Sequence, residues 1–312
     1  MIGLAQVYVL AGLTFTAFAL LSARDASNPR RFANTGFWAL LALSMLAGDR
    51  LGDFGNGVLV VALVGIAGLR GLGKGTGGSA AEERAANADR HGNRLFLLAL
   101  VIPATALAGT FLFKQFPALV DARQVTLVSL ALGVVLALGA GAAWLRPAPL
   151  VPLEEGRRLM DAVGWAGILP QMLASLGAVF ALAGVGDVVG GLMADVIPDG
   201  SLLGAVIAYG LGMALFTMVM GNAFAAFPVM AAAIGLPLLI GEYQGDPAIV
   251  CAIGMLAGFC GTLMTPMAAN FNIVPAALLE LTDRNAVVKA QIATALPLLV
   301  VNIALIYWLA FP

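Results

Sequence analysis

Charged residues, histidine and cysteine are all scarce in this chain. Charged side chains make up 11% of its 312 residues, whereas a soluble globular domain carries about a quarter. The formal net charge of −1 leaves no basic surface for nucleic acid. The single histidine, His91, has no ligand-type residues beside it at metal-site spacing, so we expect no metal centre.

The two cysteines do not form a functional pair. Cys251 and Cys260 lie in one apolar segment, separated by about two and a half turns of a helix, so their side chains point to opposite sides. We therefore expect both to be packing residues.

A membrane enzyme would also need a nucleophile with a base, or metal ligands, at membrane depth. The chain offers neither, so we expect no enzyme activity and no cofactor.

Apolar residues, in contrast, dominate the composition. They account for 61% of the chain, and the mean hydropathy is strongly positive. The 38 glycines suit close packing of helices in lipid, because small residues let backbones approach each other. The composition therefore predicts an all-α, polytopic membrane protein whose first partner is the lipid bilayer.

Long apolar runs divide the chain into candidate spans of about twenty residues. They predict about eight full transmembrane helices plus one re-entrant hairpin, or ten spans if the hairpin is an ordinary pair. Residues 1–150 form a predicted N-terminal scaffold of five helices. The candidate spans are residues 3–22, 34–48, 54–70, 95–113, 124–145, 159–185, 201–220, 224–240, 248–280 and 290–311.

The distribution of basic residues predicts the orientation. All of the 16 basic residues except Arg50, Lys114 and Arg123 fall on one side of this layout, and the side rich in Lys and Arg is cytoplasmic. Both termini then face out. No positive charge precedes residues 3–22, which is the reverse of a secretory signal, so we expect a retained first span and a multi-pass protein of the bacterial inner membrane.

Small polar residues interrupt two apolar segments, at residues 217–228 and 258–272. Hydrocarbon cannot satisfy free backbone N–H and C=O groups, so such breaks occur only where protein or a water-filled cavity covers them. Secondary transporters use them as binding sites for solutes and coupling ions. The pattern therefore predicts a transport site near the bilayer midplane.

The first interruption favours a re-entrant hairpin over residues 201–240, although an ordinary pair of spans joined by a Gly-Asn loop stays open. The second favours a broken helix over residues 248–280. Residues 186–199 are too short and too acidic to span, and they indicate an amphipathic helix at the outer interface or a plain loop helix.

The polar groups at the two interruptions are the candidate site. Helix N-termini near Phe224 and Asn270 would favour an anion. Since no Asp, Glu, Lys or Arg lies within residues 201–240 or 248–279, Na⁺ is favoured as the coupling ion, and H⁺ stays open. Alternatively, these residues only bond to neighbouring helices. The candidate substrate- and ion-binding residues are Gly221, Asn222, Ala223, Thr262, Thr265 and Asn270, with Thr217 and Asn272 as further candidates.

Residues 160–311 resemble one repeat of the ion-transporter superfamily of secondary carriers, which includes dicarboxylate, citrate and gluconate carriers. In that superfamily a Ser-Asn-Thr-like hairpin tip precedes a span broken at a Thr-Pro loop that ends in Asn. Here the tip is Gly221-Asn222-Ala223, which departs at both hydroxyl positions, and the Thr265-Pro266 break ends at Asn270. The resemblance implies that residues 151–312 are a transport-like repeat carrying half of a site.

Over its whole length the chain resembles a bacterial membrane family known only as a domain of unknown function. This resemblance rests on the stretch at residues 24–31, on Phe37-Trp38 and on Gly48-Asp49-Arg50. It implies a second, smaller membrane protein as partner and 5-oxoproline or a related carboxylate as substrate. The expected function is a subunit of a secondary transporter for a small organic anion, as a hetero-oligomer or homodimer; the alternative is a non-transporting structural subunit.

Overall fold

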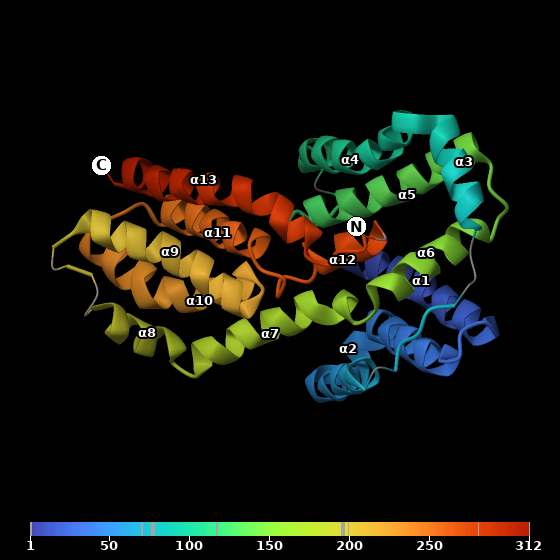
Figure 1. The fold of residues 1–312 in the computed structure, drawn as a ribbon, viewed down its shortest axis with the longest axis horizontal. Helices are drawn as coiled ribbons and strands as arrows, with labels where there is room; N and C mark the ends of the chain where they lie inside the picture. The colour runs from blue at the N-terminus through green and yellow to red at the C-terminus, as the bar shows by residue number, and fades with distance from the viewer. Residues whose placement is uncertain are drawn as a thin grey trace. The chain divides into compact units, whose positions relative to one another are not determined.

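The computed structural model describes residues 2–69, 71–75, 79–116, 118–194, 197–198, 200–279 and 281–311. These ranges are helical and contain no strand; the only β-type pairing among them is an isolated bridge between Ile2 and Val120. Figure 1 shows the order of the helices along the chain. The predicted all-α fold is confirmed.

Seven helical stretches among the described residues are long and apolar enough to cross a membrane, and a bent pair supplies an eighth. This finding indicates a multi-pass membrane protein, as the composition predicted. The seven stretches are Leu4–Arg24, Arg31–Gly68, Glu82–Lys114, Val125–Leu145, Leu202–Met220, Ala223–Glu242 and Ala286–Leu309.

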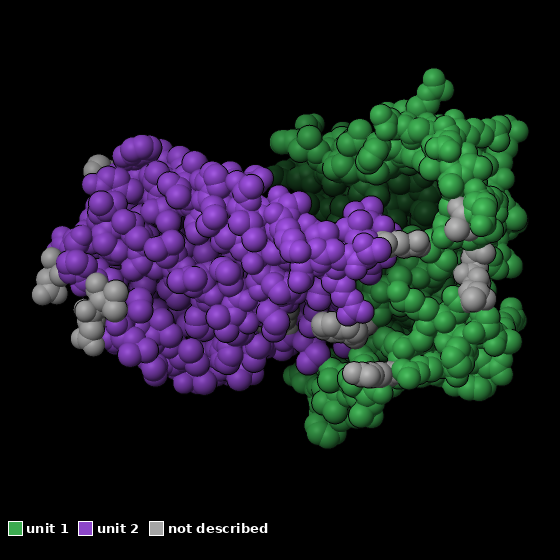
Figure 2. Space-filling view, viewed as in Figure 1, with its two compact units in different colours: residues 1–164 green, residues 165–312 purple. Residues whose placement is uncertain are grey.

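The chain divides into two compact units, residues 1–164 and 165–312, which Figure 2 colours separately. The sequence predicts a boundary at residue 150. The difference is helix α6 (Val151–Val163), which packs against α1 (Leu4–Arg24) and therefore belongs to the first unit. Gly156 permits this contact, because a Cβ there would lie 3.1 Å from the ring of Phe18.

The first unit consists of two helix pairs and shorter connecting helices. Helix α1 packs along α2 (Arg31–Gly68), and α4 (Phe96–Lys114) packs along α5 (Val125–Leu145). Short helices α3 (Ala81–His91) and η1 (Gly92–Leu95) precede α4. Helix α2 consists of two helical parts that meet across a kink at Gly52 (φ 62°, ψ −178°), and this kink lies between residues 34–48 and 54–70, which were expected as separate spans.

The second unit is a bundle whose core lies between α9, η3, α11 and α13. Its most deeply buried large side chains include Tyr209, Met213, Ile234, Val250 and Ile306. The elements of this unit are η2 (Gly164–Ile168), α7 (Leu169–Leu182), α8 (Val185–Ala194), α9 (Leu202–Met220), α10 (Ala223–Met230), the π-helix η3 (Ala231–Glu242), α11 (Pro247–Leu263), α12 (Ile273–Leu278) and α13 (Ala286–Leu309).

The single span expected over residues 159–185 is interrupted, because α6 ends at Val163 and α7 begins at Leu169, and a sharp bend follows α7. The helical segments Ser175–Leu182 and Val185–Met193 meet at 68°, and Gly184 at the corner has a φ of 66°, which suits glycine. The expected helix at 186–199 corresponds to α8, which ends at Ala194. Residues 195, 196 and 199, including Asp195 and Asp199, lie outside the described residues.

Candidate functional site

The first interruption lies where α9 turns into α10. Gly221 ends α9 in a left-handed conformation (φ 74°), and its N–H donates to the Thr217 carbonyl at 2.7 Å. Asn222 begins α10, and its Oδ1 accepts the Phe224 N–H at 2.7 Å. Asparagine is a favoured N-cap because its side chain satisfies an orphan helix donor. We call residues 221–222 the tip loop.

The second interruption follows α11. Helix α11 ends at Leu263 and α12 starts at Ile273, so residues 264–272 form an irregular connection that we call the break loop. The Nδ2 group of Asn272 donates to the carbonyls of Thr262 (2.8 Å) and Thr265 (2.6 Å). A single buried amide therefore holds the end of α11 against the start of α12.

One expected feature of the break differs in the structure. The half-helix expected to start near Asn270 starts at Ile273, and it has only six residues. A helix dipole grows with the number of aligned peptide units, so a helix of this length adds little to the field at the site. The break loop contributes carbonyl and side-chain groups instead.

The two loops contact each other directly, although they lie far apart in the sequence. The Thr265 hydroxyl donates to the Met218 carbonyl at 2.9 Å and accepts from the Met267 N–H at 3.2 Å. A Cβ on Gly221 would lie 2.5 Å from the Met267 carbonyl oxygen. The backbones of the tip loop and the break loop are therefore in van der Waals contact, within the second unit.

Glycines on α11 make this contact possible. A Cβ at Gly261 would lie 2.3 Å from the Ala214 carbonyl oxygen of α9. A Cβ at Gly258 would lie 3.1 Å from the Ala223 Cβ and 3.3 Å from the Thr217 hydroxyl. Helix α11 thus packs closely against both arms of the hairpin, because glycine leaves no side chain between the helices, as small residues allow in membrane bundles.

The structure gathers most of the predicted site residues around these loops. Asn222 is 8% exposed, while Asn270, in the break loop, is half-buried. The Thr262 hydroxyl donates to the Phe259 carbonyl of its own helix at 2.6 Å, so this side chain has an internal role. The fully buried members of the set are Thr217, Ala223, Thr262, Thr265 and Asn272.

Two buried polar atoms near the loops have no hydrogen-bond partner among the described residues, the Thr217 hydroxyl and the Oδ1 of Asn272. At Asn222 the Oδ1 is engaged in the helix cap, which leaves the Nδ2 available. Buried polar groups are normally paired. An unpaired hydroxyl, amide oxygen and amide N–H₂ are the groups with which a polar solute or ion would bond.

Helix polarity supplies a fixed positive potential here. Residues Ala223–Glu242 form one continuous helical stretch, and its N-terminus lies at Asn222. The N-terminal end of a helix carries about half a positive elementary charge and favours anions. The tip loop can therefore attract an anion although residues 201–240 contain no Lys or Arg.

Three aromatic residues that the sequence reasoning missed flank the two loops. Phe224 packs edge-to-face against Phe259 (centroids 5.7 Å apart), and Phe259 lies 6.3 Å from Phe271. Phe224 and Phe271 are 55% and 42% exposed. The available signal was the position of two of them, since Phe224 follows Asn222 by two residues and Phe271 follows Asn270 by one.

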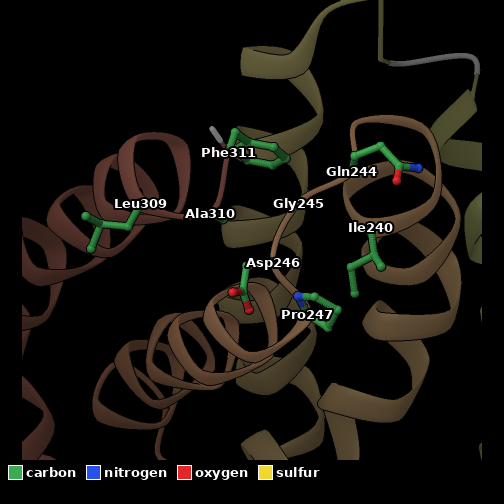
Figure 3. Close-up of a pocket in the computed structure, with 8 residues that line it drawn as sticks. All are labelled: Ile240, Gln244, Gly245, Asp246, Pro247, Leu309, Ala310 and Phe311. Atoms are coloured by element: carbon green, nitrogen blue, oxygen red, sulfur yellow. The ribbon is translucent and has the colours of Figure 1, made fainter.

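Two cavities lie at the other end of the same helices. One of about 510 Å³ is formed by the loop between η3 and α11 and by the end of α13 (Figure 3). Asp246 in this loop caps α11 through the Ala248 N–H at 2.8 Å. A second cavity of about 410 Å³ lies between α8 and η3 and includes Asp187 and Glu242. In the part of the chain that the structure describes, no three His, Cys, Asp or Glu residues converge as metal ligands.

Comparison with known proteins yields one match. Residues 5–311 match a family model described as "Protein of unknown function (DUF979)". No curated protein and no solved structure matches the chain.

Proposed function

Because the chain belongs to the DUF979 family of proteins of unknown function, its activity must be inferred from its own residues, and we propose that it is a subunit of a secondary active transporter for a small organic anion. It would act in the bacterial inner membrane, with both termini outside. The substrate would be 5-oxoproline or a related carboxylate, and the coupling ion Na⁺.

The contact between the tip loop and the break loop is the observation that supports this proposal. Two helix interruptions in apolar segments meet through the Thr265–Met218 hydrogen bond. Irregular backbone is costly at membrane depth, where unpaired groups find no water, and its usual use there is to bind a solute or ion. A purely structural subunit has no need of two such interruptions in contact.

The chemistry of the two loops favours an anion together with a hard cation. The N-terminus of the Ala223–Glu242 stretch and the Asn222 amide would face the carboxylate of the solute. The Thr217 hydroxyl, the Asn272 Oδ1 and backbone carbonyls offer neutral oxygen ligands, which suit Na⁺. Proton coupling would require a titratable group outside residues 201–240 and 248–279, for example on a partner.

A second half-site would have to come from another subunit. The carriers that residues 160–311 resemble hold their solute between two repeats, and the chain carries one tip and one break. We propose a second, smaller membrane protein as the partner, with an antiparallel homodimer as the other arrangement.

Uptake measurements test the proposal. Cells that lack their own 5-oxoproline carrier would express the chain alone, with the adjacent smaller membrane protein, or with that protein and a variant at Asn222. Labelled 5-oxoproline, and then a panel of small carboxylates, would be supplied with and without Na⁺. We expect Na⁺-dependent uptake of at least one of these anions when both proteins are present.

Three substitutions at Asn222 separate binding from helix capping. Asn222→Asp keeps the cap acceptor but removes the amide N–H₂ and adds a negative charge; Asn222→Ser keeps the cap acceptor alone; Asn222→Ala removes both. Because Ser and Asp cap helices as well as Asn does, a residue that only caps would tolerate both changes. We expect Asn222→Asp to abolish uptake and Asn222→Ser to reduce it, with normal membrane insertion.

The outcomes discriminate between the alternatives. Uptake by the chain alone would replace the hetero-oligomer with a homodimer. Full uptake in all three Asn222 variants would favour the structural-subunit alternative. The absence of Na⁺-dependent uptake of every anion in the panel, despite insertion of both proteins, would overturn the proposed function.

A further inference from the structure

A buried cluster of charged residues lies in the first unit, outside the proposed transport site. Arg157 of α6 makes ion pairs with Asp25, in the loop after α1, and with Asp161, one turn further along α6. All three side chains are more than nine-tenths buried. Charged groups are almost never buried to this extent unless they are paired, so this cluster requires an explanation of its own.

The charges of the cluster do not cancel. Asp25 Oδ2 lies 3.0 Å from Nη1 of Arg157, and Asp161 Oδ2 lies 3.1 Å from the same nitrogen. Two carboxylates therefore share one guanidinium nitrogen, and the cluster carries a net charge of −1 when both are ionised. Two carboxylates this close resist simultaneous ionisation, and they titrate as a pair.

Neutral donors complete the surroundings of Asp161. Its Oδ1 accepts from Nδ2 of Asn34 at 2.9 Å and from the indole N–H of Trp38 at 2.8 Å, both on α2. The charged groups in contact with Asp161 among the described residues are thus Arg157, on its own helix, and, across the shared nitrogen, Asp25 from the end of α1. Within the part of the chain that the structure describes, no second cation pairs with either carboxylate.

A glycine-rich segment covers this cluster. Asn34 exchanges two hydrogen bonds with Gly73, donating to its carbonyl (2.8 Å) and accepting its N–H (2.9 Å). A Cβ on Gly75 would lie 2.2 Å from Asp25 Oδ2, so only glycine lets the backbone of residues 71–75 rest against this carboxylate. Asn34 links the segment to Asp161 directly.

Two further polar atoms beside the ion pairs have no partner. The Ser22 hydroxyl, one turn before Asp25 on α1, and Nε of Arg157 are both buried without a hydrogen bond among the described residues. Unsatisfied buried groups of this kind occur where a structure has a second state or a functional task.

We propose that Asp25 and Asp161 form a proton-binding site that takes up one proton as a pair and thereby controls how residues 71–75 are held. The proton comes from solvent and adds to one carboxylate oxygen, and no other bond forms or breaks. The cluster then becomes neutral, Arg157 remains paired with the other carboxylate, and the hydrogen bonds from Asn34 and Trp38 to Asp161 weaken. This site concerns the first unit alone and does not depend on the proposed transport.

The direction of the pKa shifts agrees with this geometry. Burial raises the pKa of Asp161 above its ordinary value, and the hydrogen bond from Trp38, the charge of Arg157 and the bond from Asn34 do not offset it. Burial also acts on Asp25, but hydrogen bonds from Ser27 and the charge of Arg157 hold its pKa below the ordinary value. The proton therefore goes to Asp161 first.

Trp38 provides a direct readout, because its indole N–H donates to the titrating carboxylate. In a variant with Trp144, Trp165 and Trp308 replaced by Phe, the purified full chain in lipid nanodiscs would be titrated while Trp38 emission is recorded. We expect one transition, absent in Asp161→Asn. In Asp25→Asn the midpoint should move to lower pH, because removing the neighbouring negative charge makes Asp161 easier to ionise.

Infrared spectroscopy keeps the test valid if Asp161→Asn fails to fold. Difference spectra of the otherwise unaltered chain across the same pH range should show a protonated-carboxyl band in register with the Trp38 transition. The exposed Asp89→Asn variant is the matched control and should leave both signals unchanged. No Trp38 transition between about pH 4 and 8, or the same transition in a folded Asp161→Asn variant, would overturn the proposal.

Discussion

At the residue scale, the contact between the tip loop and the break loop depends on very few atoms. One hydroxyl, that of Thr265, bonds to the backbone of the last turn of α9 and to that of the break loop, and one glycine, Gly221, lets the backbones of the two loops touch. Asn272 holds the break loop to the end of α11 through two carbonyls. Because each of these residues acts through a different contact, single substitutions can separate their effects.

Thr265→Val should destabilise the chain by about 1 kcal/mol, because it removes the hydrogen bond to the part-buried Met218 carbonyl while keeping nearly the same volume. Thr265→Ser keeps the hydroxyl, so it should lower the free energy of unfolding much less. Equilibrium unfolding of the purified protein in detergent, monitored by circular dichroism, measures the difference. Equal losses in both variants would mean that packing of the threonine methyl group matters more than the hydrogen bond.

Gly221→Ala should be more damaging than an ordinary Gly→Ala change. The positive φ disfavours alanine by about 1 kcal/mol, and the new Cβ would lie 2.5 Å from a backbone oxygen that a rotamer change cannot move. The matched control is Gly65→Ala in α2, where an added Cβ meets nothing within 4 Å and helix propensity improves. A melting temperature for Gly221→Ala equal to that of the control would contradict the close contact.

At the element scale, α6 holds the connecting segment before α3 in place within the first unit. Glu155 accepts hydrogen bonds from the backbone N–H (2.6 Å) and the hydroxyl (2.7 Å) of Ser79, and its other oxygen pairs with Arg158 at 2.8 Å. Arg84, in the first turns of α3, donates in turn to the Ser79 carbonyl. A single carboxylate therefore anchors the end of this segment, just before α3.

This anchor should depend on pH. Burial raises the pKa of Glu155, but the hydrogen bonds from Ser79 and Arg158 outweigh it, so the pKa lies below the ordinary value of 4.5. A lowered carboxyl pKa stabilises the folded form above pH 4.5, and this contribution is lost as the pH falls through the folded value. Protection of the Ser79 amide against hydrogen exchange should fall as the pH drops through that range. In Glu155→Gln this protection should already be lower at neutral pH. Unchanged protection in the variant would show that other contacts hold the segment.

At the scale of the whole molecule, the remaining question is how each helix relates to the bilayer. Helix α9 and the Ala223–Glu242 stretch are each long enough to cross it, so length alone does not separate two full spans from a re-entrant hairpin. The position of the tip loop relative to the two surfaces does separate them. In a re-entrant hairpin the tip and break loops lie within the bilayer, and in a pair of spans they reach the cytoplasmic side.

Single-cysteine labelling should decide between these arrangements. In a background with Cys251 and Cys260 replaced by Ala, a membrane-impermeant maleimide should label Gln244→Cys in intact cells. It should label Arg90→Cys, on exposed α3, only after permeabilisation. Met267→Cys, whose native side chain is 62% exposed, should resist labelling on both sides for a re-entrant hairpin. Labelling of Met267→Cys only after permeabilisation would indicate two full spans.

The sequence by itself determined the class of the protein and the positions of the two interruptions. Apolar runs, Gly221-Asn222 and the Thr265-Pro266 break are local signals, because helix formation, capping and breaking depend on residues within a few positions of each other. The all-helical fold could be predicted for the same reason. Local signals were less successful at Gly184, where packing of the surrounding helices decides how sharply the chain bends.

Only the tertiary structure decided which groups meet. Thr265 bonds to a carbonyl 47 residues away, the three phenylalanines come from separate segments, and Asp161 reaches Asn34 across 127 positions. No periodicity or motif encodes such distances, because side-chain contacts between helices depend on which faces the whole bundle buries. Sequence therefore predicted where the helices break, and packing determined that the two breaks face each other and that a separate acidic pair is enclosed around Arg157.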